Sequence, residues 1–200
     1  MRIGIIGAGN VARGVTRLVT GNGHQVVLSN GHGPETLSTL VADLGPAVTA
    51  GTVGEAARED IVVLAVPWAA VPDAVAGLPA WNARIVIDAT NHWIRAGDKI
   101  EPADLGGRTS SEVVAGLLPA ARVVKAFNTL PVRIFERDPR EAGGNRVLFV
   151  SGDDAAAKYE VRSLLEDLHF ATIDLGDLRT GGGLQQAGGP LSGANLLRLP

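Results

Sequence analysis

The chain has 200 residues, of which 46% are hydrophobic, so it is long enough for one domain with a proper core. It contains no cysteine, which excludes disulfides, iron–sulfur clusters and thiol nucleophiles. A net charge of −3 and a pI near 5.8 give no basic footprint, so nucleic acid is not an expected partner.

The start of the chain shows no targeting segment. Met1 leads directly into the apolar run 2–6, without the basic region or the cleavage site of a signal peptide. No apolar stretch approaches the roughly 18 residues that a membrane span requires. We therefore expect a cytoplasmic protein that has no membrane partner.

Predicted strands and helices alternate along the chain. Strands are predicted at 2–6, 25–29, 47–50, 61–66, 84–88, 122–126, 146–150 and 170–174. Helices are predicted at about 10–21, 34–44, 52–58, 69–77, 110–118 and 153–167. Unbroken apolar runs such as Ile61–Val66 are typical of parallel strands that are covered on both faces. The repeated β-α-β spacing predicts the α/β class, with a Rossmann-type, doubly wound, mainly parallel sheet.

Two stretches, 89–109 and the glycine-rich 176–200, interrupt this pattern and are expected to be irregular. We expect a single domain over 1–200 with a glycine-rich C-terminal tail. Within it, we expect residues 1–125 to form the core and residues 126–200 to form a second, dimer-forming part. Because the tail's leucines (Leu191, Leu196, Leu197 and Leu199) need burial, a homodimer is predicted in which the tail packs against the other subunit.

The clearest motif directly follows the first strand. It reads Gly7-Ala8-Gly9-Asn10-Val11-Ala12, the G-x-G-x-x-A variant of the dinucleotide fingerprint. Gly7 permits the tight turn, Gly9 leaves bare backbone for a pyrophosphate, and Ala12 lets the helix pack closely on the sheet. The first residues of the following helix, Asn10 and Val11, offer backbone N–H donors, and the N-terminus of that helix carries positive potential. A ligand-free glycine turn is the alternative, but the position between a strand and an amphipathic helix favours NAD(P).

The end of the second strand bears on the choice of nucleotide. An NAD site usually has Asp or Glu there to bind the ribose 2′-OH, whereas this chain has Asn30, Gly31 and His32. The missing carboxylate favours NADP over NAD, although no Arg or Lys replaces it. His32 either pairs with a 2′-phosphate or is an ordinary loop residue. We expect NADP, with NAD possible.

Residues after the next two strands are expected to hold the nicotinamide end. They are Val66, Pro67 and Trp68 after the fourth strand and Ala89 and Asn91 after the fifth. Trp68 is equally compatible with plain packing and Asn91 with a turn. We interpret Asp88 as structural.

The sixth strand runs into Asn128, Thr129, Leu130 and Pro131, which adds small polar groups to the same edge of the sheet. Lys125, within that strand, is expected to reach solvent rather than to catalyse. The histidines show no ligand spacing, and no Ser-His-Asp arrangement is evident, so neither a metal site nor a catalytic acid–base residue is predicted.

The sequence resembles the family of F420-dependent NADP oxidoreductases, also called predicted dinucleotide-binding enzymes. The matching segments are Ile3–Asn10, Gly23-His24, Asp60 to Trp68, Val123–Pro131, Val150–Asp154 and Gly189–Ser192. Members that prefer NADP tend to carry Ser-Arg where this chain has Gly31-His32.

The resemblance implies hydride transfer between NADP(H) and a coenzyme F420 (deazaflavin) or flavin acceptor. It places the acceptor ring near Asn128–Val132 and Gly189–Ser192, with Pro190 and Leu191 in contact. It also implies that binding and orientation provide most of the catalysis. A non-catalytic NAD(P)-binding module for redox sensing or regulation is the alternative.

Overall fold

The computed structural model describes residues 1–200. The strands of its large sheet are β1 (Arg2–Ile6), β2 (Gln25–Ser29), β3 (Val48–Ala50), β4 (Ile61–Leu64), β5 (Ile85–Asp88), β8 (Arg122–Lys125), β9 (Arg140–Glu141), β10 (Gly144–Gly152), β11 (Ala171–Asp174) and β12 (Leu197–Arg198). The α-helices are α1 (Asn10–Gly21), α2 (Ser38–Leu44), α3 (Val53–Ala56), α4 (Val71–Val75), α5 (Ser110–Leu117), α6 (Val132–Phe135), α7 (Ala155–Asp167) and α8 (Thr180–Gln185). Two 3₁₀ turns, η1 (Pro34–Leu37) and η2 (Trp68–Ala70), precede α2 and α4.

The large sheet has the strand order β11-β10-β8-β5-β4-β1-β2-β3, with β9 and β12 also paired to β10. Its strands are parallel from β3 to β8, whereas β10 is antiparallel to β8 and parallel to β11. The winding direction reverses between β1 and β4, which is where ligands bind in folds of this kind. The predicted Rossmann-type, mainly parallel sheet is confirmed.

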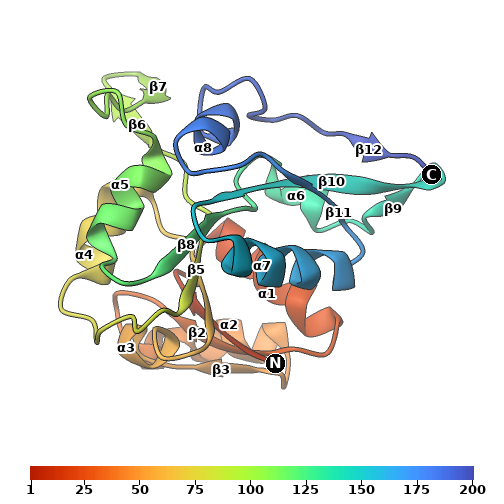
Figure 1. Cartoon of the computed structure of the whole chain (residues 1–200). Coiled ribbons are helices and arrows are strands. Elements are labelled where there is room, and N and C mark those ends of the chain that lie inside the picture. Colours follow the sequence, from red (N-terminus) through yellow and green to blue (C-terminus); the bar gives the residue numbers. More distant parts are fainter.

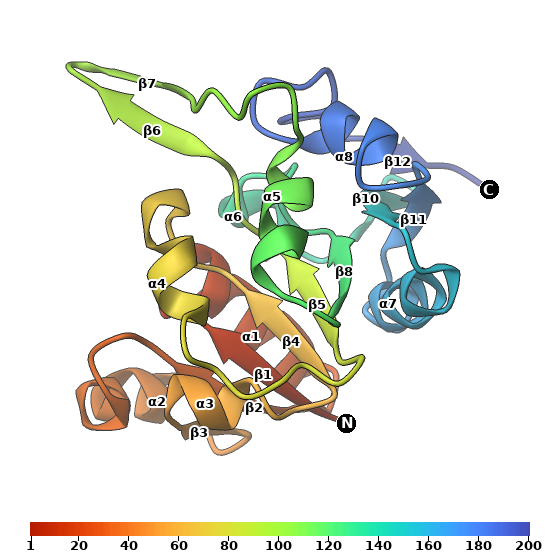
Figure 2. The same ribbon diagram turned by 60° about the vertical axis from the view of Figure 1, so that its left-hand side comes forward.

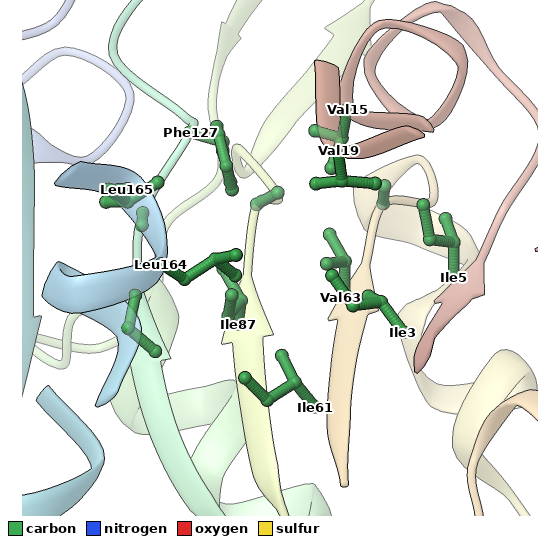
Figure 3. Close-up of a cluster of buried hydrophobic side chains, with 14 of the residues drawn as sticks. Ile3, Ile5, Val15, Val19, Ile61, Val63, Ile87, Phe127, Leu164 and Leu165 are labelled. Atoms are coloured by element: carbon green, nitrogen blue, oxygen red, sulfur yellow. The ribbon is translucent and has the colours of Figure 1, made fainter. Parts of the chain in front are cut away.

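Alternation along the strands creates two apolar layers, one on each face of the sheet. Figure 1 shows the helices that lie against the sheet. Ile3 and Ile5 pack on the face covered by α1 and α7, while Ile6 packs on the face covered by α3, α4 and α5. Figure 3 shows Val15 and Val19 of α1 directed toward the strands, across from the leucines of α7. Because both faces are covered, the inner residues of β1, β2, β4, β5 and β8 are all apolar or glycine, and polar residues occur only at the ends of these strands.

Every predicted strand and helix occurs, with ends shifted by a few residues. The expectation of irregular structure in 89–109 was wrong, because β6 (Trp93–Ala96) and β7 (Lys99–Pro102) form a hairpin there that projects from the body (Figure 2). The two strands pair only with each other, and most of their residues are exposed. The sequence there therefore lacks the apolar pattern that a buried strand would show. No helix has the length and apolar content needed to cross a membrane.

The tail 176–200 was also expected to be irregular and to pack on a second subunit. It forms α8 and β12 instead, and β12 pairs with β10 of its own chain. Leu191 packs against Val147 and Phe149 of β10, whereas Leu196 and Leu199 stay exposed. Burial of Leu191 therefore needs no partner, and the homodimer stays a prediction.

Candidate functional site

The turn between β1 and α1 lies close against the neighbouring strand. Gly7 has a φ of +124°, and a Cβ there would lie 2.2 Å from the carbonyl oxygen of Ala65. Its N–H donates to the carbonyl of Ser29 at 3.0 Å, which ties the turn to the end of β2 as well. Only glycine fits both the conformation and the contact.

Gly9, two residues later, borders open space. It is the N-cap of α1 and gives no side-chain cap, and a Cβ there would meet no atom within 4 Å. The first N–H groups of a helix have no partner within the helix, so those of Asn10 and Val11 face this space. Ala12 behind them is fully buried on the sheet. An anionic diphosphate fits this bare, positively polarised cradle.

The loop after β2 is shaped by Asn30. The Asn30 Nδ2 donates to Thr36 Oγ1 and its Oδ1 accepts from the N–H of His32, both at 2.9 Å. The His32 ring is exposed, and Gly31 leaves open space beside it. Sequence reasoning missed Glu35, whose carboxylate lies against Gly33. The pattern expected at an NAD site places the acid at the strand end itself, so a carboxylate on η1 gave no signal.

We name the residues that follow β4, β5 and β8 (65–68, 89–92 and 126–131) the rim. On it, Pro67 is exposed and Trp68 is half-buried. The Trp68 ring meets the His92 ring edge-on, with centroids 5.9 Å apart. His92 is buried and its Nδ1 has no hydrogen-bond partner. Burial and the nearby Lys125 charge lower the pKa of His92, so the imidazole is neutral at pH 7.

Beneath the rim lies a buried ion pair. Lys125 and Asp88 are both fully buried, with the Lys125 Nζ 3.0 Å from Asp88 Oδ2. The expectation that Lys125 reaches solvent was wrong, because β8 lies inside the sheet between β5 and β10. The same Nζ donates to the carbonyl of Thr90 at 3.2 Å. The pair therefore fixes the first residues that follow β5.

Four hydrogen bonds hold Asp88 as a carboxylate, one of which comes from Lys125 Nζ. Ser111 Oγ of α5 donates to Asp88 Oδ2 at 2.5 Å, and the hydroxyl and N–H of Thr90 donate to Oδ1 at 2.6 and 2.9 Å. Burial alone raises the pKa of Asp88, but the Lys125 ammonium and the hydrogen bonds from Ser111 and Thr90 outweigh it and hold that pKa below its ordinary value. These contacts agree with the structural interpretation of Asp88.

Side-chain amides join the two central parts of the rim. Asn91 Nδ2 donates to the carbonyl of Asn128 at 2.8 Å, and Asn128 Nδ2 donates back to Asn91 Oδ1 at 3.2 Å. Gln185 of α8 donates to Asn128 Oδ1 at 3.0 Å, and its Oε1 accepts from Ser151 Oγ. Sequence reasoning missed Gln185, since nothing in a glycine-rich tail indicates that α8 returns to the rim.

The predicted acceptor segment divides into two groups. The tail does return to it, because the N–H of Gly193 donates to the carbonyl of Thr129 at 2.8 Å. Leu130, however, packs into the main core, and Leu191 packs on β10. Pro131 and Pro190 are exposed. The expectation that the Leu130 side chain lines an acceptor face is therefore corrected, whereas Leu191 is half-buried and its role stays a prediction.

The site thus combines the anion cradle at the start of α1 with a rim of neutral amides and backbone. The charged groups beneath the rim, Asp88 and Lys125, neutralise each other out of reach of solvent. No group of three or more His, Asp or Glu side chains is arranged to hold a metal. Such a site is suited to binding and orienting planar groups rather than to acid–base chemistry.

Comparisons with known proteins agree with this geometry. Residues 2–92 match the family described as NADP oxidoreductase, coenzyme F420-dependent. A hypothetical protein from Sinorhizobium meliloti is similar in structure, with 40% identity, a TM-score of 0.92, and coverage of 99% of this chain and 96% of that one. A protein from Arthrobacter sp. FB24, provisionally described as an F420-dependent NADP reductase, has 30% identity and a TM-score of 0.79 over 89% of this chain and 86% of that one.

A relative of known activity is more distant. The metalloreductase STEAP3 of Rattus norvegicus is 29% identical over 186 residues, which are 88% of this chain and 34% of that protein. This chain therefore spans about a third of the length of the curated relative that it matches.

Replacing Gly9 with valine tests the cradle. Gly9 has φ −77° and ψ −172°, which valine adopts readily, so Gly9→Val is expected to fold with a loss of about 1 kcal/mol at the helix cap. Its side chain fills the space above α1, and NADPH binding, measured by the fluorescence of the reduced nicotinamide, should be abolished. Gly116→Val, which also enters open space, is the control that should bind normally. Unchanged NADPH affinity in a folded Gly9→Val would remove the cradle from the site.

The buried pair predicts a specific dependence of stability on pH. Because the folded pKa of Asp88 lies below its unfolded value of about 3.9, its contribution is present above that pH and lost as the pH falls through the folded pKa. Asp88→Asn should lower the free energy of unfolding at pH 7 by about 3–5 kcal/mol, because it leaves Lys125 buried and unpaired.

Urea unfolding from pH 7 to pH 2.5 measures both effects. The double variant Asp88→Asn/Lys125→Met should recover much of the loss, and its stability should fall less steeply in acid than that of the parent. A single variant as stable as the parent would show that the pair does not hold the rim.

Proposed function

Because the chain belongs to the family of F420-dependent NADP oxidoreductases, we propose that it transfers a hydride between NADP(H) and a flavin or deazaflavin ring at the rim. The observation that carries the proposal is the pairing of a bare diphosphate cradle at Gly9 with an uncharged amide surface at Asn91 and Asn128. The first suits a dinucleotide and the second suits a planar ring.

The roles that we propose follow the strand ends. The diphosphate lies at Gly7, Gly9, Asn10 and Val11, the adenosine ribose at Asn30, Gly31 and His32, and the nicotinamide half at Val66, Pro67, Trp68, Ala89 and Asn91. Asn128, Thr129, Pro131 and Pro190 border the acceptor, with Gln185 holding Asn128 in place. When bound, NADPH supplies two electrons as a hydride; the acceptor ring takes that hydride and one proton from solvent.

The charge of the rim supports a ring in preference to a carboxylate substrate. A carboxylate needs a free guanidinium or ammonium to receive it. The ammonium nearest the rim belongs to Lys125, which is fully buried and engaged by Asp88. Within the rim itself, the hydrogen-bonding groups that remain are uncharged, and these orient the polar edge of a heterocycle without selecting an acid.

An acceptor panel tests the proposal. NADPH oxidation should be followed with coenzyme F420, FMN, FAD and riboflavin in turn, with Gly9→Val as the inactive control. At least one ring should be reduced with NADPH, at a rate that Gly9→Val abolishes. If NADPH binds but no ring is reduced, the chain is a non-catalytic binding module for redox sensing or regulation.

A choice between NADP and NAD at His32 predicts a difference between the two cofactors on substitution. An imidazole N–H can donate to a 2′-phosphate, so His32→Ala should weaken NADPH binding and leave NADH affinity unchanged. Glu35→Gln should tighten NADPH binding about twofold, because a carboxylate beside Gly33 repels a 2′-phosphate. An equal change for the two cofactors in His32→Ala, measured by binding titration, would exclude His32 from the site.

A further inference from the structure

A groove of unusual charge runs beside α1, outside the rim. Its first part, a pocket of about 330 Å³ between α1 and α6, is lined by Asn10, Arg13, Arg17, Val132, Arg133 and Glu136. A second pocket of about 360 Å³ shares Arg17 and Glu136 with the first and continues to Asn22 and His169. We name the two pockets together the basic groove.

The basic groove holds more positive than negative charge. Its arginines are Arg13, Arg17, Arg133, Arg137 and Arg140, and its carboxylates are Glu136 and Asp138. Each carboxylate already has an arginine partner, Arg17 to Glu136 at 2.8 Å and Arg140 to Asp138 at 2.9 Å. The other arginines make no ion pair. Of these, Arg13 donates from its Nε to the carbonyl of Ala8 at 3.0 Å. In a chain of net charge −3, this local excess of guanidinium groups over carboxylates favours an anionic ligand.

The position of the basic groove relates it to the proposed acceptor. Its upper end includes Val132, which directly follows Pro131 of the rim, and Asn10 beside the phosphate loop. From there it follows α1 to Asn22, a distance of about 18 Å at 1.5 Å per residue. α6 lies tightly on α1, since a Cβ on Gly14 would lie 2.7 Å from the Phe135 ring. The groove therefore starts at the acceptor segment and leads away from the ring.

We propose that the basic groove binds an anionic side chain carried by the acceptor ring, such as a phosphate, a phosphodiester or a row of carboxylates. The proposal rests on the proposed function for the position of the ring. It adds that the acceptor is a ring with an anionic chain, as in FMN or coenzyme F420, and that riboflavin binds more weakly. In the proposed function, the diphosphate of NADP(H) binds at the N-terminus of α1. The basic groove is therefore available to the second ligand, the hydride acceptor.

Binding of FMN and riboflavin to the full chain in the presence of NADP⁺ tests this, because the two share a ring and differ in one phosphate. Quenching of flavin fluorescence gives both Kd values without turnover. FMN should bind at least about fivefold more tightly than riboflavin, and Arg133→Ser/Arg137→Ser should remove that advantage while leaving riboflavin binding unchanged. Raising the salt concentration should have the same effect on FMN. Arg58→Ser, an exposed arginine near the opposite ends of the strands, is the matched control and should change nothing.

Three results would overturn the proposal. The first is an equal affinity of the parent for FMN and riboflavin. The second is an equal loss of affinity for FMN and for riboflavin in the double variant. The third is a weaker NADPH affinity in the double variant, which would assign the arginines to the dinucleotide. Coenzyme F420 in place of FMN should show a larger effect if the groove follows a longer anionic chain. Arginine-dependent FMN binding without hydride transfer would leave the groove standing and reject the proposed function.

Discussion

An ion pair sealed between two parallel strands determines the shape of the rim. Burying Lys125 and Asp88 costs hydration, and their attraction offsets that cost only because the remaining donors and acceptors are also satisfied. Ser111 and Thr90 provide that satisfaction. The pair thus ties β5, β8 and α5 together at the height where the strands end. The amide contact between Asn91 and Asn128 depends on this, since each residue follows one member of the pair by three positions.

This arrangement separates charge from the reacting surface. Within the rim the charges cancel below the surface, and His92 is neutral because burial and Lys125 both disfavour its protonated form. The strong positive potentials lie at the periphery, at the N-terminus of α1 and in the basic groove. Hydride transfer moves two electrons between neutral or delocalised rings, so an uncharged surface suits it. In the function that we propose, charged groups recognise the phosphates and carboxylates of the ligands, away from the ring atoms.

The sequence predicts most of this fold because its signals are local. Unbroken apolar runs identify the parallel strands, and the position of Gly7 and Gly9 identifies the tight turn between β1 and α1. The errors at the site concern residues whose environment depends on distant partners. Lys125 is buried because β10 adds to the sheet beyond β8, and Gln185 reaches the rim because α8 returns from the tail. Neither feature produces a periodic pattern in the sequence, because each depends on contacts between segments that lie tens of residues apart.

The acceptor side of the rim is built by one strained turn and one returning segment. Phe127 has a φ of +61°, a conformation that costs energy for any residue other than glycine. Its ring, buried in the core against Phe135, holds the turn in place. The turn presents Asn128 to Asn91 on one side and to Gln185 on the other. The contact between Phe127 and Phe135 therefore maintains the strained backbone at Phe127, and this backbone orients the side-chain amide of Asn128. The surface opposite the proposed nicotinamide position is thus made from the same chain, by the segment after β8 and by α8.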